Sequence, residues 1–328
     1  MDPAKLTSRL RDILRDQPGR VVPVERPAPG RRLPSFEAAA SVLGASRWTV
    51  DGADCLVVER EYPADLRYGV MPIGEYAEAS ARAIRGLDLL GGDTGDLLAD
   101  ADSPRETLGR QLFFDLETTG LAGGAGTYAF LVGFGYFQGT TFQTRQFFLA
   151  DYADERYLLR AVSEFVERAR GLVTFNGRTF DLPLIATRYS MQRLRSPFEE
   201  LPHVDMLHPA RRLWRRRRQA SSDRSGWPDP AGTGGGEYAS CALGALERAI
   251  LDVARVGDVP GAEIPARYFD YIRRGDATPL VDVFEHNRLD LLSLAALTSI
   301  VLTMIEGGAE ATHNPRECLA LGRLFEQT

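Results

Sequence analysis

The order of apolar runs in the middle of the chain restricts the protein to few fold classes. Three strand-like runs come first, and a helical pattern, a short apolar run and a second helix follow. In chain order the runs lie at 112–116, 128–137, 141–149, 154–170 and 172–175, with the second helix after residue 180. This order predicts an α/β protein in which a mixed sheet is flanked by helices.

The flanking segments predict a chain in three parts. Residues 1–108 would form an extension, with a short amphipathic helix, a Pro- and Arg-rich linker and a β-hairpin at the turn signal Asp51-Gly52. Residues 109–306 would form the main domain. Residues 307–328 contain a helix-capping pattern at Asn314 and no stop signal, so we expect a helix that continues in a longer protein. Further helices are expected at 241–251, 262–273 and 279–305.

The chain is acidic, with a formal net charge of −6 at pH 7. If such a protein binds nucleic acid, it must neutralise phosphates locally, through bound cations or a confined basic patch. The 3 cysteines form no CxxC pair and the first residues lack a signal peptide, so we expect a cytoplasmic protein. The most apolar stretch, 291–305, is shorter than the roughly 20 residues of a membrane span, which predicts a core helix and no membrane partner.

Two acidic residues stand at the end of the first apolar run. Asp115 and Glu117 are two positions apart, so on a strand they point to the same face. Two carboxylates that converge there repel each other unless a divalent cation lies between them. Taken alone, such a pair is more often two solvated acids at a strand end.

Two further segments place acids where regular structure begins. Asp181 follows the short apolar run and precedes a helix, where it could also serve as the N-cap. His286 and Asp290 are four residues apart and lie on one face of a helix, where an ordinary His–Asp pair is the alternative.

Taken together and in this order, the three segments resemble the exonuclease motifs of DEDD nucleases. Within that group the chain is most similar to the YprB-like ribonuclease H-like family, over about residues 110–305, with further matching stretches at 203–214 and 257–265. The resemblance implies a DnaQ-like ribonuclease H-like fold, followed by helical repeats of which residues 307–328 would be the start. It also implies a 3′→5′ exonuclease that hydrolyses phosphodiester bonds at single-stranded or frayed 3′ ends of nucleic acid.

The resemblance also implies a site with two divalent cations, Mg²⁺ or Mn²⁺. Asp115 would bridge both ions, Glu117 and Asp290 would complete the first, and Asp181 would hold the second. His286 would orient or deprotonate the attacking water, because an imidazole accepts a proton near neutral pH. Histidine here has the spacing of the tyrosine-type members, which makes this role less secure than those of the four acids.

Other residues resemble the part of the site that holds the terminal nucleotide. They are Thr118, Thr119, Gly120 and Leu121, with Asn176 in support of the site. Simple turn roles are the alternative for all of them.

Asp205 and the arginines that follow it allow two interpretations. Asp205 could be a fifth acid near the site, but capping or an arginine partner is favoured. The arginine run at 211–218, which includes Trp214, could follow a nucleic-acid backbone and stack on a base, or it could be a solvated face.

Two other classes of function compete with an active nuclease. One is a non-catalytic nucleic-acid-binding module on the same fold, and the other is a structural or partner-binding protein. The complete set of acids argues against the first, and the presence of three matching segments in the right order argues against the second.

Overall fold

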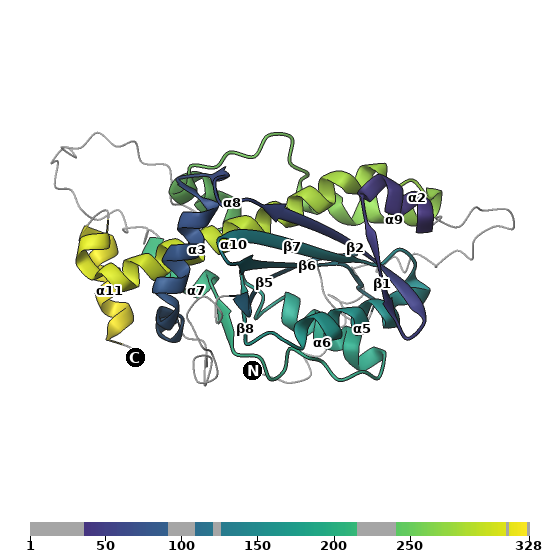
Figure 1. Ribbon diagram of the computed structural model, residues 1–328, viewed down its shortest axis with the longest axis horizontal. Helices are drawn as coiled ribbons and strands as arrows, with labels where there is room; N and C mark the ends of the chain where they lie inside the picture. The colour runs from purple at the N-terminus through teal and green to yellow at the C-terminus, as the bar shows by residue number, and fades with distance from the viewer. Residues whose placement is uncertain (1–35, 91–108, 121–125, 215–240, 313–314, 327–328) are drawn as a thin grey trace, which may run out of the picture. The chain divides into compact units, whose positions relative to one another are not determined.

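The structure is a computed structural model, and it describes residues 36–90, 109–120, 126–214, 241–312 and 315–326 (Figure 1). The predicted N-terminal helix and linker lie outside these residues. The 7-stranded main sheet has the order β1-β2-β7-β6-β5-β8-β9. Its strands are β1 (Ser46–Val50), β2 (Ala53–Tyr62), β5 (Gln111–Thr118), β6 (Ala129–Gln138), β7 (Thr141–Phe148), β8 (Gly171–Thr174) and β9 (His203–Asp205).

The sheet is mixed, as the sequence predicts. Strands β5, β8 and β9 run parallel to one another, and the other neighbours are antiparallel. The antiparallel hairpin β1–β2 turns at Asp51 and Gly52 and joins the main sheet through β7. A separate two-stranded sheet pairs β3 (Arg67–Tyr68) with β4 (Met71–Pro72). The predicted boundary at 108/109 stays a prediction, but residues on both sides of it contribute strands to one sheet.

Helices cover both faces of the main sheet (Figure 1). On one face α5 contacts β1, β2 and β7, and α6 contacts β6; on the other, α10 contacts β5 and β6. The helices are α2 (Phe36–Leu43), α3 (Ile73–Arg82), α5 (Glu155–Val166), α6 (Asp181–Met191), α7 (Leu207–Trp214), α8 (Leu243–Leu246), α9 (Ile264–Arg274), α10 (Val281–Gly307) and α11 (Pro315–Phe325). The π-helical turn η3 (Glu247–Leu251) follows α8. The predicted fold class, a mixed sheet flanked by helices, is confirmed.

Helix α10 is the apolar helix expected from the sequence. The helical stretch Thr278–Ala311 is long and apolar enough to cross a membrane by composition, but 72% of its most apolar window is buried inside the protein. Leu291, Leu294 and Val301 are at most 1% exposed. They pack in the core between α10 and the sheet, together with Phe113 of β5.

Alternation along β5 decides which of its side chains meet α10. Phe114 packs in the core on the α5 side, whereas Phe113 packs with α10. Because successive strand residues point to opposite faces, Asp115 and Glu117 share the face of Phe113. The two acids therefore lie on the side of the sheet that α10 covers.

Candidate active site

The acids of the three predicted segments come together beside β5. Asp115 and Glu117 lie on β5, Asp181 is the first residue of α6, and Asp290 lies on α10. A cavity of about 190 Å³ opens between β5, the start of α9 and α10. It is lined by Asp115, Leu116, Glu117, Thr118, Gly261, Ile264, Pro265, His286 and Asp290.

The electrostatics of the acids reflect their closeness. Burial raises the pKa of Asp115 well above its ordinary value of 3.8, and the charges of Asp290 and Asp181 raise it further. Burial and the charges of Asp115, Asp290 and Asp181 likewise raise the pKa of Glu117. Burial, with the charges of Asp205 and Asp290, raises the pKa of Asp181 to about 7, against the effect of its own backbone N–H. Such repulsion arises only when like charges share a confined space.

Asn287, the residue after His286, links the side chain of Asp115 to a side chain on β7. In the register of the strands, Asp115 of β5 lies beside Gly133 of β6, and Gly133 lies beside Gln146 of β7. The side chain of Asn287 fills the space above Gly133. It donates a hydrogen bond of 2.7 Å to Asp115 Oδ2 and accepts one of 2.8 Å from Gln146 Nε2. A Cβ at position 133 would lie 2.1 Å from the Asn287 oxygen, so this arrangement requires glycine.

The loop before Asp181 is shaped by Asp205. The Asp205 carboxylate accepts hydrogen bonds from the backbone N–H groups of Asn176, Arg178 and Leu207. Asn176 has a φ of 67°, a left-handed conformation that asparagine tolerates better than most residues. Asp205 therefore has the predicted capping role, although its charge also reaches Asp181. Asp181 is not the N-cap of α6, because the helix begins at Asp181 and Phe180 is in the cap position.

His286 is held by an acid from another segment. Its Nδ1 lies 2.7 Å from Asp258 Oδ1, and its Nε2 lies 3.7 Å from Asp290 Oδ2. Burial alone would raise the pKa of Asp258, but the hydrogen bond with His286 and the nearby Arg255 lower it. Asp258 lies in a stretch that the sequence analysis singles out, but nothing in the sequence indicates that its partner is His286.

Arg255 contacts several acids at once. Its guanidinium forms ion pairs with Glu247, Asp258 and Asp290, and the Asp258 contact is 3.1 Å long. Sequence analysis missed this residue. No spacing rule relates positions 255 and 290, so only the folded chain brings them together.

The residues expected to hold the terminal nucleotide form a turn after β5. Thr118 Oγ1 donates to the carbonyl of Gly120, and Thr119 Oγ1 accepts from the backbone N–H of Tyr128. Thr118 also lines the cavity. These contacts agree with the turn role, and a contact with substrate stays a prediction. Leu121 lies outside the described residues.

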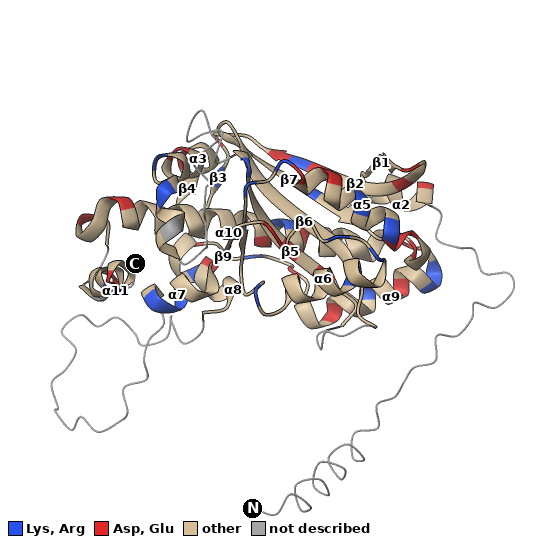
Figure 2. Cartoon of the chain, turned by 90° about the horizontal axis from the view of Figure 1, so that it is seen from below, with Lys and Arg blue, Asp and Glu red and all other residues tan. Residues whose placement is uncertain are grey.

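Helix α7 carries the start of the predicted arginine run. Arg211 and Arg212 are exposed, and part of the α7 ribbon is blue in Figure 2. Trp214 is 6% exposed and packs in the core, so the interpretation of this side chain as a platform for a base is wrong. Residues 215–218 lie outside the described part of the chain.

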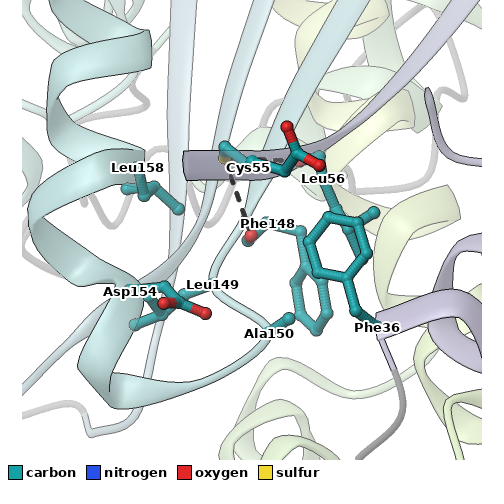
Figure 3. A pocket seen from close by; sticks show the side chains of 9 residues that line it. Phe36, Cys55, Leu56, Phe148, Leu149, Ala150, Asp154 and Leu158 are labelled. Atoms are coloured by element: carbon teal, nitrogen blue, oxygen red, sulfur yellow. Dashed lines mark hydrogen bonds between the residues drawn. The ribbon is translucent and has the colours of Figure 1, made fainter. Parts of the chain in front are cut away.

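A smaller cavity lies between α2, β2, β7 and α5 (Figure 3). Its volume is about 10 Å³, room for about one water molecule. Cys55 lines it, and burial raises the pKa of this thiol to about 12, which makes it a poor nucleophile. The cavity between β5 and α10 is therefore the better candidate for a functional site.

The donor set of the candidate site suits a hard divalent cation. Its carboxylate oxygens are ligands that Mg²⁺ and Mn²⁺ prefer, and a cation between them would relieve the repulsion that raises their pKa values. Among the described residues, no three His, Cys, Asp or Glu side chains already stand in a metal-ligating arrangement. Asp290 is paired with Arg255 instead. The chemistry of these donors fits a cation, and Arg255 occupies one of the two oxygens of Asp290.

Comparisons with known proteins place these features in a family context. The sequence profile of the RNase_H superfamily matches residues 112–302, which include all four acids. The chain is also 30% identical over 272 residues to YprB of Bacillus subtilis (strain 168), an uncharacterized protein. That match covers 83% of this chain and 59% of YprB, so the chain spans less than two thirds of its relative.

Proposed function

Because the chain belongs to the RNase_H superfamily, whose members are generally hydrolytic nucleases, we propose that it is a metal-dependent 3′→5′ exonuclease of the DEDD type. The observation that carries the proposal is the cluster of buried carboxylates beside the cavity. Asp115, Glu117 and Asp181 come from two segments far apart in the chain, and burial together with the charge of Asp290 raises the pKa of each. Strongly perturbed acids of this kind, gathered at a cavity, are typical of functional sites.

Asp115, Glu117, Asp181 and Asp290 would hold two divalent cations, Mg²⁺ or Mn²⁺. When bound, the cations would neutralise the charge that develops on the phosphate during hydrolysis. The protein contributes rigidity: Asn287 fixes Asp115, and Asp205 fixes the loop that leads to Asp181. Bound cations would also offset the electrostatic repulsion between this acidic protein and an anionic substrate.

His286 is the proposed acceptor of the proton from the attacking water. It lines the cavity, and Asp258 holds its Nδ1 at 2.7 Å, so Nε2 is the ring nitrogen left for the cavity side. A neighbouring carboxylate that accepts a hydrogen bond from Nδ1–H leaves Nε2 free to act as a base. The proposed substrate is the 3′ end of a single-stranded or frayed nucleic acid, with the turn Thr118–Gly120 close to the terminal nucleotide.

One observation favours a second candidate, a nucleic-acid-binding module without turnover. Asp290 is paired with Arg255, and an acid in such a pair is not free to bind a metal. The module and the nuclease differ in a single measurable respect, namely whether bound strands become shorter.

The test uses the purified protein and strands of DNA and RNA labelled at the 5′ end. Stepwise shortening that requires Mn²⁺ or Mg²⁺, stops with chelator and is lost in Asp115→Asn is the expected result. A loss of about 1,000-fold would correspond to roughly 4 kcal/mol of transition-state stabilisation. If the unchanged protein and Asp115→Asn both bind the strands tightly and neither shortens them under any metal condition, the result would instead establish the binding module.

A further inference from the structure

Arg255 is buried among acids at the edge of the candidate site. Its side chain is 10% exposed, and its guanidinium contacts Glu247 at the end of α8, Asp258 in its own loop and Asp290 on α10. Its Nε is buried and has no hydrogen-bond partner among the residues that the structure describes. The hydrogen bonding of this arginine is therefore incomplete in the present arrangement.

The loop that carries Arg255 is shaped to reach α10. Gly257 has a φ of 74°, and Val256 beside it is 98% exposed. At this turn Val256 points outward, whereas the two charged residues of the turn, Arg255 and Asp258, point inward. Asp258 therefore contacts His286, and Arg255 contacts Asp290. One short loop thus contacts two residues that lie one turn apart on α10.

Both oxygens of Asp290 have a cationic or potentially cationic neighbour. Oδ1 is paired with Arg255, and Oδ2 lies 3.7 Å from Nε2 of His286. A divalent cation that uses Asp290 as a ligand must take over at least one of these positions. A positive guanidinium and a positive metal ion repel each other, so the two compete for the same carboxylate.

We propose that Arg255 acts as a latch on Asp290. The Arg255 guanidinium pairs with the Asp290 carboxylate in the metal-free protein and releases it when a divalent cation binds. The inference rests on the proposed function, because it assumes a cation at the acid cluster. Glu247 and Asp258 make the release feasible: the guanidinium keeps two carboxylate partners when it gives up the third. Arg255 is a positioning residue, since it acts on a ligand and not on the substrate.

The test is calorimetric titration of Mn²⁺ into the metal-free protein, without substrate. Arg255→Met removes the competing charge, and we expect it to bind Mn²⁺ about tenfold more tightly, a change that corresponds to about 1.4 kcal/mol. Arg255→Lys keeps a positive charge but cannot bridge several carboxylates, so an intermediate affinity is expected. Arg267→Met is the matched control, because Arg267 pairs with Asp282 at the start of α10 and lines no part of the cavity.

A second measurement guards against a variant that folds poorly. Mn²⁺ should raise the melting temperature of Arg255→Met more than that of the unchanged protein, because the contact with Asp290 that the variant lacks stabilises only the metal-free state. Equal or weaker Mn²⁺ binding by both Arg255 variants would overturn the latch and assign Arg255 to holding Asp290 in place for the metal. If neither the unchanged protein nor any variant binds Mn²⁺, the proposed metal site itself is wrong.

Discussion

Asn287 shows how a single uncharged residue organises the acid cluster. It is fully buried, and its amide links Asp115 on β5 with Gln146 on β7 across the strand between them. Gln146 also donates to the carbonyl of Phe284, so the contact reaches back to α10. The hydrogen bond from Asn287 opposes the burial that raises the pKa of Asp115. Asn287 therefore stabilises the charged form of the central acid.

Replacing Asn287 with leucine should destabilise the protein by about 1–3 kcal/mol, because Asp115 and Gln146 each lose a buried hydrogen-bond partner. Urea denaturation measures the change in the free energy of unfolding. Gln143→Leu on β7 is the control, since Gln143 bonds Glu61 near the surface and should change stability by less than about 0.5 kcal/mol. Equal effects of the two substitutions would show that the Asn287 contacts contribute nothing specific.

At the scale of elements, the site depends on how closely α10 approaches β6. Gly133 leaves room for Asn287, and Gly135 leaves room for Phe142 and Leu291. Larger residues at either position would separate the helix from the sheet and move Asp290 away from Asp115. The two glycines thus determine how close to the sheet the part of α10 that carries Asp290 can lie.

Gly133→Ala should cost about 1–3 kcal/mol through overpacking, because the added methyl group would overlap the Asn287 amide. Thermal denaturation tests this, and weaker Mn²⁺ binding should accompany the loss of stability. Gly126→Ala is the matched control, since a Cβ there meets no atom within 4 Å. A Gly133→Ala protein as stable as the control would contradict the close packing of α10 on β6.

A buried ion pair joins the two helices on the opposite face of the sheet. Arg188 of α6 donates to both oxygens of Glu155 of α5, at 2.5 and 2.7 Å, and both side chains are 2% exposed. Gln192 donates to the same carboxylate, and the guanidinium lies 4.1 Å from the centre of the Tyr128 ring. This pair fixes α6, whose first residue is Asp181.

Arg188→Met should destabilise the protein by about 3–5 kcal/mol, because the Glu155 carboxylate would stay buried without its guanidinium. The double variant Arg188→Met/Glu155→Leu should recover much of that loss, since it removes both charges. Chemical denaturation of the two variants gives the comparison. Arg195→Met, in a pair whose partners are each 77% exposed, is expected to change stability by at most about 1 kcal/mol. A double variant no more stable than Arg188→Met would argue against an unpaired charge as the cause.

For the whole molecule, the acid cluster links stability to pH and to metal. Asp115, Glu117 and Asp181 all have folded-state pKa values above their ordinary values. Their protonated forms are thus favoured by folding, and this contribution is complete below about pH 4 and is lost as the pH rises through the folded-state values. His203 acts in the opposite sense between about pH 4 and 6.5, because burial lowers its pKa to about 4.

A comparison with Asp181→Asn isolates one acid from these opposing effects. In metal-free buffer the variant should gain stability relative to the unchanged protein as the pH rises from 5 to 8, because the pKa of Asp181 is about 7. Denaturation at several pH values measures this difference. At pH 8, saturating Mn²⁺ should make the unchanged protein more stable than the variant, since only the unchanged protein has the Asp181 carboxylate as a ligand for the metal. A difference that does not vary with pH would show that folding does not raise the pKa of Asp181.

The sequence by itself determined the local elements and the chemical identity of the site. Strands β5 to β8 and helices α5, α6 and α10 lie close to the predicted segments, because alternation and helical periodicity directly encode which face of an element is buried. The resemblance to the exonuclease motifs predicts the roles of Asp115, Glu117, Asp181 and Asp290. These roles stay predictions, and the structure brings the four acids together.

Only the tertiary structure decided which groups face the acids. It adds the hairpin β1–β2 to the edge of the main sheet at β7, buries Trp214, and brings Asn287, Asp258 and Arg255 to their partners. Arg255 and Asp290 are 35 residues apart and belong to different elements. Local periodicity specifies which face of an element is buried, but the partner of a buried charge depends on the packing of elements across the fold.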